Sequence, residues 1–319
     1  MDTFPRPRSA RRGTYSVVAR DPETGAMGVA VQSHWFSVGP LVPWAESGVG
    51  AVATQANVDV SYGPRLLERL RSGQPAGDAL RELVDADTEG ATRQVAVVDT
   101  RGSVAAHTGV DCMPFAGHVT SDDLSCQANL MADERVWPAM AEAFQTASGS
   151  FPYRLLAALD AGEAAGGDIR GRQSAAILVV PAQGHRWERI VDLRVEDNPE
   201  PLVELRRLMR LHDAYVLAGE GDSLVGEGRL DEAAIRYVQA NQINPGNPEL
   251  TFWAGLSLIT QGDEDGGLRL VRAAMATHPA WSELLARLNP RSGPGVERAR
   301  QLLGVGENVT LPQSRDDTR

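Results

Sequence analysis

The chain has 319 residues, of which 42% are hydrophobic, and its formal net charge is −11. This acidic balance argues against a nucleic-acid-binding surface, which needs a basic face, and the absence of lysine excludes Schiff-base chemistry and a phosphate-binding P-loop. The length allows two domains with ordinary packed cores. No apolar run approaches the roughly 18 residues of a membrane span, so no membrane contact is expected.

The cysteines and histidines do not predict a metal site. Cys112 and Cys126 form neither a disulfide framework nor a metal-ligand spacing, so we expect two reduced thiols in a cytoplasmic protein. The six histidines are scattered and match no metal-binding motif. No metal and no other cofactor is therefore expected.

The first thirteen residues, MDTFPRPRSARRG, contain four arginines and two prolines and are predicted to form a disordered leader. Arg11 and Arg12 fit a twin-arginine export signal, but Arg20 and Asp21 interrupt the apolar run that follows them. This interruption argues against export.

From residue 14 onward the pattern alternates between blocks of strands and pairs of helices. The expected elements are strands at 14–20, 27–32 and 49–57, helices at 65–71 and 76–87, strands at 94–99, 104–108 and 124–130, helices at 133–146 and 152–165, and strands at 174–180 and 186–193. The strand blocks contain hairpins and each helix pair has one apolar side. One economical arrangement is two stacked antiparallel sheets with helices on both outer faces.

A helical domain is expected after the turn at 198–201. Gly228 and Gly262 are 34 residues apart, as are Pro245 and Pro279, which is the period of a tetratricopeptide (TPR) repeat. Two such repeats over 214–281 form too small a stack to bury their apolar faces alone. The segments expected to cover them are 202–211, 281–288 and 296–303, within an α-helical TPR-like domain at 205–304 that is followed by a flexible tail at 305–319.

Two long segments carry a family resemblance: TYSVVARDPETGAMGVAVQSHWFSVGPLVPWAESGVGAVATQANVDVSYGPR and GEAAGGDIRGRQSAAILVV, the latter followed by VDLRVEDNPEP. They resemble a bacterial family known as domain of unknown function 1028, over residues 14–205. That family is similar to the N-terminal-nucleophile (Ntn) hydrolases. The resemblance implies an α+β class and a four-layer αββα Ntn-hydrolase-like sandwich over 14–200.

The resemblance also implies that Thr14 is the nucleophile. An α-amino group titrates near ~8, so a threonine at a free N-terminus can deprotonate its own hydroxyl. Family members usually place this threonine directly after the initiator methionine. Here exposure needs cleavage of the Gly13–Thr14 bond, by the protein itself or by another protease, or a start codon assigned too far upstream. A glycine favours self-cleavage because it tolerates a strained carbonyl.

Several polar residues are candidates to assist Thr14, and each has a structural alternative. Either Ser16 or Ser33 is expected to orient the amino group by a hydrogen bond, unless both are ordinary strand hydroxyls. Asn57 and Asn129 both end a Gln-Ala-Asn triplet, and one of them is expected to donate to an oxyanion, unless both are turn residues.

The expected substrate-binding residues lie in two short segments. Arg20 and Asp21 would set the protonation state of the amine, unless they form a surface ion pair. In the glycine-rich run GGDIRGRQS, Asp168 and Arg170 would recognise charged groups of a substrate, and Ser174 opens a strand that would end beside Thr14. A plain loop with a salt bridge explains the same run.

The sequence thus leads to two hypotheses from different classes. The first is an amidohydrolase that attacks a small amide or short peptide through Thr14. The second is an uncut, catalytically silent binding module whose TPR-like repeats mediate protein–protein interaction. In either case the repeats would contact a protein partner or a second copy of the chain, and no nucleic acid is expected to bind.

Overall fold

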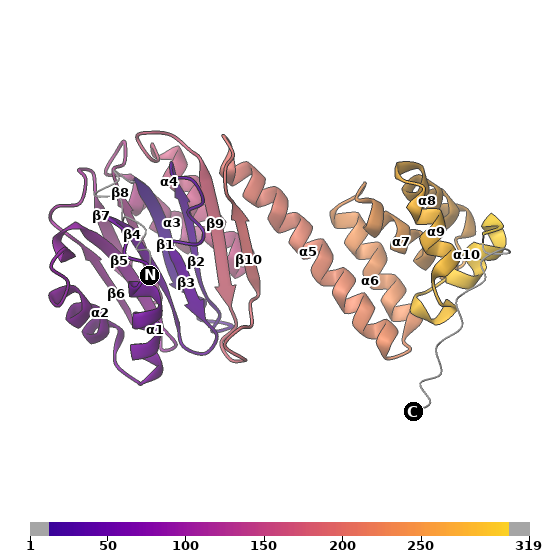
Figure 1. The fold of residues 1–319 in the computed structure, drawn as a ribbon, viewed down its shortest axis with the longest axis horizontal. Helices are drawn as coiled ribbons and strands as arrows, with labels where there is room; N and C mark the ends of the chain where they lie inside the picture. The colour runs from indigo at the N-terminus through magenta and orange to yellow at the C-terminus, as the bar shows by residue number, and fades with distance from the viewer. Residues whose placement is uncertain (1–12, 306–319) are drawn as a thin grey trace, which may run out of the picture. The chain divides into compact units, whose positions relative to one another are not determined.

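The computed structural model describes residues 13–305 (Figure 1). The disordered leader expected at 1–13 lies outside this range, except for Gly13, which is buried. The tail expected at 305–319 also lies outside it, except for Val305. The chain divides into two compact units, Met1–Arg207 and Leu208–Arg319. Within residues 13–305 no helix is both long and apolar enough to cross a membrane.

Two antiparallel sheets form the centre of the first unit. The six-stranded sheet has the order β10-β9-β2-β1-β8-β7, and the four-stranded sheet has the order β3-β4-β5-β6. The strands are β1 (Thr14–Arg20), β2 (Met27–Ser33), β3 (Pro43–Glu46), β4 (Gly50–Ala56), β5 (Arg93–Asp99), β6 (Val104–Thr108), β7 (Gly117–Ser121), β8 (Leu124–Asn129), β9 (Ser174–Val180) and β10 (Val191–Val195).

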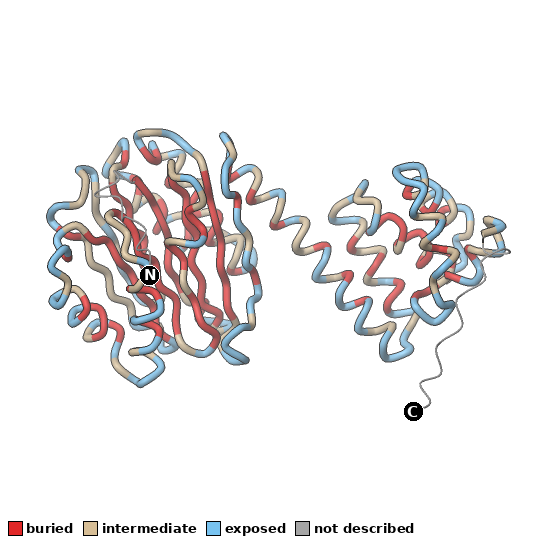
Figure 2. Tube along the Cα trace, in the orientation of Figure 1, coloured by how far each residue is buried: buried red, intermediate tan, exposed pale blue. Residues whose placement is uncertain are grey.

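The two sheets pack face to face through small and β-branched side chains. Val29 and Val31 of one sheet share a buried cluster with Ala51, Ala53 and Ala96 of the other. Alanine and valine are short, which allows two pleated surfaces to pack closely over a long area. Figure 2 shows the central strands buried along most of their length.

Helices cover the outer faces of both sheets. Helices α1 (Tyr62–Arg71) and α2 (Ala76–Asp85) pack leucines against Val52, Val95 and Val97 of the four-stranded sheet. Helices α3 (Val136–Thr146) and α4 (Phe151–Ala164) pack against strands of the six-stranded sheet. A short 3-10 helix, η1 (Gly90–Thr92), precedes β5. The first unit therefore has four layers: helices, sheet, sheet, helices.

Most of the predicted elements are confirmed, and the edge strands are where the prediction was wrong. Strands β3 and β7 were not expected, and β10 occupies 191–195 instead of 186–193. Pro43 opens β3, which is an edge strand, the position where a proline costs no ladder hydrogen bond. Strand β7 is also an edge strand, and its half-exposed residues lack the apolar pattern from which strands are predicted.

The second unit consists of helices. They are α5 (Pro201–Gly226), which crosses the boundary between the units, and α6 (Leu230–Ile243), α7 (Pro248–Thr260), α8 (Glu264–Thr277), α9 (Ala280–Arg287), η2 (Pro290–Ser292) and α10 (Val296–Leu303). The separate helix expected at 202–211 is the first part of α5. Gly228 and Gly262 both adopt positive φ in the turns after α5 and α7. Gly255 and Gly267 let α7 and α8 approach closely, since a β-carbon at residue 267 would lie 2.5 Å from the carbonyl oxygen of residue 255.

Candidate active site

Thr14 lies at one end of the six-stranded sheet, where β1 begins. It pairs with Ser33 at the end of β2 and with Asn129 at the end of β8. Neighbouring antiparallel strands bring the start of one beside the end of the next, so three polar residues distant in sequence meet at this edge. Thr14 is only 3% exposed, and Ser33 and Asn129 are fully buried.

The carbonyl oxygen of Gly13 accepts hydrogen bonds from the side chains of Ser33 and Arg170. Ser33 Oγ donates to it at 2.5 Å and Arg170 Nη2 at 2.9 Å. The Thr14 hydroxyl oxygen lies 2.7 Å from the same carbonyl oxygen and 3.1 Å from Ser33 Oγ. A carbonyl that accepts from a hydroxyl and a guanidinium is polarised, and its carbon becomes more electrophilic.

Asp168 holds Arg170 in place through a two-pronged ion pair. Arg170 Nε donates to Oδ1 at 3.0 Å and Nη2 to Oδ2 at 2.8 Å. The carboxylate also accepts from the backbone N–H groups of His34 and Arg170. The Asp168 side chain is fully buried, and its backbone forms an isolated bridge with Met131. These contacts fix both the carboxylate and the guanidinium that polarises the Gly13 carbonyl.

A buried amide network joins the two sheets at Thr14. Gln55 Nε2 donates to the Thr14 carbonyl at 3.2 Å and to Gln94 Oε1 at 2.8 Å. Asn129 Nδ2 donates to the same Gln94 oxygen at 2.9 Å, and Gln94 Nε2 donates to the Ala128 carbonyl at 2.8 Å. Buried amides with several partners hold one geometry, because each broken bond leaves a desolvated group.

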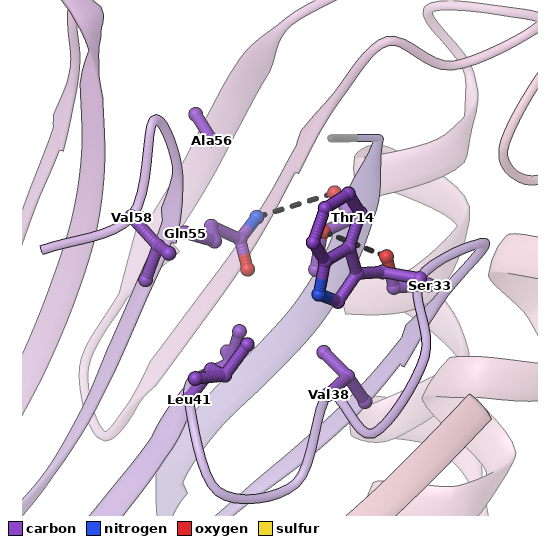
Figure 3. Close-up of a pocket in the computed structure, with 9 residues that line it drawn as sticks. Thr14, Ser33, Val38, Leu41, Gln55, Ala56 and Val58 are labelled. Carbon is purple, nitrogen blue, oxygen red and sulfur yellow. Dashed lines mark hydrogen bonds between the residues drawn. The ribbon is translucent and has the colours of Figure 1, made fainter. Parts of the chain in front are cut away.

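A small pocket opens beside the Thr14 and Ser33 hydroxyls. Its other lining residues are Trp35, Val38, Leu41, Val42, Gln55, Ala56 and Val58. Figure 3 shows Val38, Leu41 and Val58 around the space next to the two hydroxyls, with Gln55 reaching the Thr14 carbonyl. The pocket is small, with a volume of about 10 Å³, which leaves room for about one water molecule.

Of the residues expected at the site, the structure brings Ser33, Asn129, Asp168 and Arg170 to Thr14. Ser33 contacts both the hydroxyl and the preceding carbonyl. Asn129 faces the carbonyl of Thr14, 3.4 Å from it, rather than the hydroxyl. Its Oδ1 is buried without a hydrogen-bond partner among the described residues.

Asn57 is not brought to Thr14. Its amide donates to Glu89 Oε2 at 3.2 Å and to Thr92 Oγ1 at 3.1 Å. Ala56 adopts a φ of 65°, which turns the chain at the end of β4 and directs the next side chain toward η1. The oxyanion role expected for Asn57 is therefore replaced by a structural one.

Arg20 and Asp21 also lie away from Thr14, at the opposite end of β1. Arg20 is six residue steps along the strand from Thr14, which corresponds to about 20 Å. Arg20 pairs with Asp123 at 3.0 Å, and Asp21 accepts from the Thr24 hydroxyl at 2.5 Å. The prediction that Arg20 and Asp21 set the protonation state of an amine at Thr14 was therefore wrong. Arg20 forms an ion pair, and Asp21 stabilises a turn.

Ser174 begins β9, where it pairs with Ser33, but its hydroxyl supports a loop instead of facing the nucleophile. The hydroxyl donates to the Trp35 carbonyl at 2.5 Å and accepts from the Val38 N–H at 3.1 Å. Both of these residues line the pocket, so Ser174 positions the pocket wall rather than a ligand.

Sequence reasoning missed the glutamines and the loop residues that line the pocket. Gln55 and Gln94 are buried in strands that are otherwise mostly apolar, and this contrast is the signal that could have indicated a polar network. The loop residues at 35–42 gave no such signal, because an apolar residue in a loop is equally consistent with simple packing.

Two other reactive side chains, one next to Thr14 in β1 and one in the middle of β8, are held in their protonated form. Burial, together with the neighbouring Glu163 carboxylate, holds the pKa of the Tyr15 hydroxyl well above its ordinary value. Burial also raises the pKa of the Cys126 thiol. Neither group is therefore a competing nucleophile at neutral pH. Within residues 13–305 no three histidine, cysteine or acidic side chains are arranged to hold a metal ion.

Comparisons with known proteins place the first unit in a family. No curated protein matches the chain. A crystal structure of a DUF1028-family protein from Silicibacter pomeroyi matches with 36% sequence identity and a TM-score of 0.58, covering 62% of this chain and 85% of that one. The ancestral β-subunit Anbu from Yersinia bercovieri matches with 12% identity and a TM-score of 0.31, covering 60% of this chain and 91% of that one.

The family model gives the assignment. The model described as a family of unknown function, DUF1028, matches residues 14–205, which is more than half of the chain and begins at Thr14. The chain therefore belongs to the DUF1028 family.

Proposed function

We propose that the first unit is an Ntn-type amidohydrolase whose nucleophile is Thr14 Oγ1 after cleavage of the Gly13–Thr14 bond. The observation that carries this proposal is the contact between the Thr14 hydroxyl and a Gly13 carbonyl that Ser33 and Arg170 polarise. Two stacked sheets between helical layers are consistent with an Ntn-hydrolase-like sandwich at 14–200.

The first step of the proposal is self-cleavage. Thr14 Oγ1 attacks the Gly13 carbon, and the negative charge that develops on the carbonyl oxygen is stabilised by Ser33 and Arg170. The C–N bond then breaks as the nitrogen takes the hydroxyl proton, which leaves an ester at Oγ1 and a free amino group at Thr14. Water hydrolyses the ester, releasing residues 1–13 with a C-terminal carboxylate.

The second step is turnover. The α-amino group of Thr14 takes the proton of its own hydroxyl. The oxygen attacks the carbonyl of a substrate amide, the amine product leaves with a proton, and water hydrolyses the resulting ester. The space beside Thr14 is small, which favours a small amide or a short peptide as the substrate.

For the second unit we propose two TPR-like repeats within a domain at 205–304. Gly228 and Gly262 take equivalent turn positions 34 residues apart, in keeping with that period. Such repeats present a surface for a protein partner or for a second copy of the chain. This part of the proposal is a fold-level analogy.

The mass of the purified protein tests the proposal. We expect a chain that begins at Thr14, with residues 1–13 lost, and release of amines from simple amides. Thr14→Ala should retain its leader and hydrolyse nothing, while Thr14→Ser, which keeps a hydroxyl, should still cleave itself. Wild-type protein that keeps its full mass and has no amidase activity would instead support the uncut binding module.

A further inference from the structure

We propose that the pocket beside Thr14 selects a short, uncharged acyl group on the scissile carbonyl. This inference rests on the proposed function and specifies its substrate class. The acyl group is the part of the substrate that is bonded to Thr14 Oγ1 in the ester intermediate. It must therefore occupy space that adjoins this hydroxyl, and the pocket lined by Thr14 and Ser33 is such a space.

The chemistry of the lining excludes a charged group. Beyond Thr14, Ser33 and Gln55, all of the remaining lining residues are apolar, and none of the nine side chains carries a charge. The Gln55 amide is already engaged, since Nε2 donates to Thr14 and Gln94 while Oε1 accepts from Ser16. A carboxylate or ammonium in this pocket would lose its hydration without gaining a charged side chain as a partner, which is unfavourable.

The ion pair of Asp168 with Arg170 lies outside this pocket. Asp168 and Arg170 contact Gly13 and are absent from the pocket lining. The site thus separates an apolar pocket at the Thr14 hydroxyl from an ion pair at the position of residue 13. This separation is what makes the acyl selection distinct from recognition of charged groups elsewhere on a substrate.

The size of the pocket limits the length of the acyl group. Val38 and Val42 are almost fully buried and pack into the core between the sheets, so they form a fixed floor. Leu41 and Val58 are half-buried and also line the pocket. A space with room for about one water does not enclose a long chain, so we expect a short acyl group to be preferred over a hexanoyl group.

A panel of N-acyl p-nitroanilides tests the inference on protein whose N-terminus is Thr14. The acyl groups are acetyl, butyryl, hexanoyl and succinyl, where succinyl matches butyryl in length and adds a carboxylate. We expect kcat/KM for butyryl to exceed that for hexanoyl by about tenfold or more, because one methylene in an apolar pocket changes kcat/KM by about 10- to 200-fold. We expect kcat/KM for butyryl to exceed that for succinyl as well, because the carboxylate would lose its hydration in the apolar pocket.

Leu41→Ala should then raise the hexanoyl-to-butyryl ratio of kcat/KM by about tenfold, because it removes a wall of the pocket. Val58→Ala should act in the same direction and serves if Leu41→Ala fails to fold. Phe36→Ala is the matched control, since Phe36 is 62% exposed in the same loop and does not line the pocket. It should leave the ratio unchanged.

The outcomes separate this inference from the function on which it rests. Turnover that favours succinyl, or a ratio that neither Leu41→Ala nor Val58→Ala changes, overturns the acyl selection and leaves the amidohydrolase intact. A lack of turnover with all four anilides overturns the amidohydrolase and the acyl selection together.

Discussion

Gly13 packs directly against the carboxylate of Asp168. A β-carbon at residue 13 would lie 2.6 Å from Oδ2 and 2.7 Å from both Cγ and Oδ1, closer than real contacts allow. The carboxylate cannot move aside easily because Arg170 and two backbone N–H groups hold it. Residue 13 therefore must be glycine because a side chain has no space beside Asp168, and not because its backbone adopts a left-handed conformation.

Gly13→Ala should slow the loss of residues 1–13 by about tenfold or more, since overpacking at a fixed site costs about 1–3 kcal/mol. The check is the fraction of cleaved chain, followed by mass spectrometry. Asp168→Ala removes the obstacle, so adding Gly13→Ala to it should have little further effect. Gly77→Ala, where a β-carbon meets nothing within 4 Å, controls for the change of glycine itself. Equal effects of Gly13→Ala with and without Asp168 would contradict this relationship.

Ser33→Ala should slow self-cleavage by about 10²- to 10³-fold, because it removes one of the two donors to the Gly13 carbonyl besides Thr14 itself. The rate is measured as above, and thermal unfolding reports whether the fold is intact. Ser121→Ala, on an exposed edge strand, is the matched control. A variant at Ser33 that cleaves as fast as the wild type would remove this residue from the mechanism.

Gln94→Leu should lower the free energy of unfolding by about 1–3 kcal/mol. The substitution removes the acceptor that Gln55 and Asn129 share and the donor to Ala128, so buried amides lose partners. Denaturant unfolding of the Thr14→Ala background, in which no cleavage is expected, measures the effect. Gln145→Leu, exposed on α3, should change stability little. Equal stabilities of the two variants would argue against a cooperative network.

The ion pair of Asp87 with Arg93 should make stability depend on acid pH. Burial is the largest single influence and disfavours the ionised carboxylate. The hydrogen bonds from Arg93, the Glu89 N–H and Tyr62, together with the charge of Arg93, outweigh it and hold the pKa of the Asp87 carboxyl below its ordinary value. The folded state therefore binds this proton more weakly than the unfolded state. The resulting stability is present above about pH 4 and is lost as the pH falls through the lowered pKa.

Asp87→Asn should consequently be less stable than the wild type at pH 7 and closer to it at pH 3. Urea unfolding at the two values gives the comparison. Asp78→Asn, at an exposed ion pair on α2, is the control and should show little difference at either pH. A stability gap at Asp87 that stays constant down to pH 3 would refute the assignment.

Much of the fold of the first unit follows from local sequence patterns. The hairpin of β1 and β2 was predicted from alternation around the turn at 21–25, and the pairing of Thr14 with Ser33 matches it. The helices α1 to α4 were predicted from their apolar stripes. Edge strand β7 was missed because its largely exposed residues form no apolar run, and β3 was missed because it has only four residues and begins with a proline.

The candidate site could be predicted only in part from such local patterns. The alternation of apolar and polar residues and the turn residues involve neighbours a few positions apart, so they can be recognised in the sequence. The family resemblance that begins at Thr14 can be recognised in the same way. The meeting of Gly13, Ser33 and Arg170 depends on which strand ends share an edge and on a loop more than a hundred residues away.

Long-range packing also reversed some expectations. Arg20 and Asp21 were expected to set the protonation state of the Thr14 amine, yet they lie at the far end of β1, about 20 Å away. Asn57 and Asn129 end the same triplet, but a turn at Ala56 directs one amide toward η1 while β8 holds the other beside Thr14. Identical local sequence thus has different surroundings, because burial and hydrogen bonding are set by the partners that the sheets bring together.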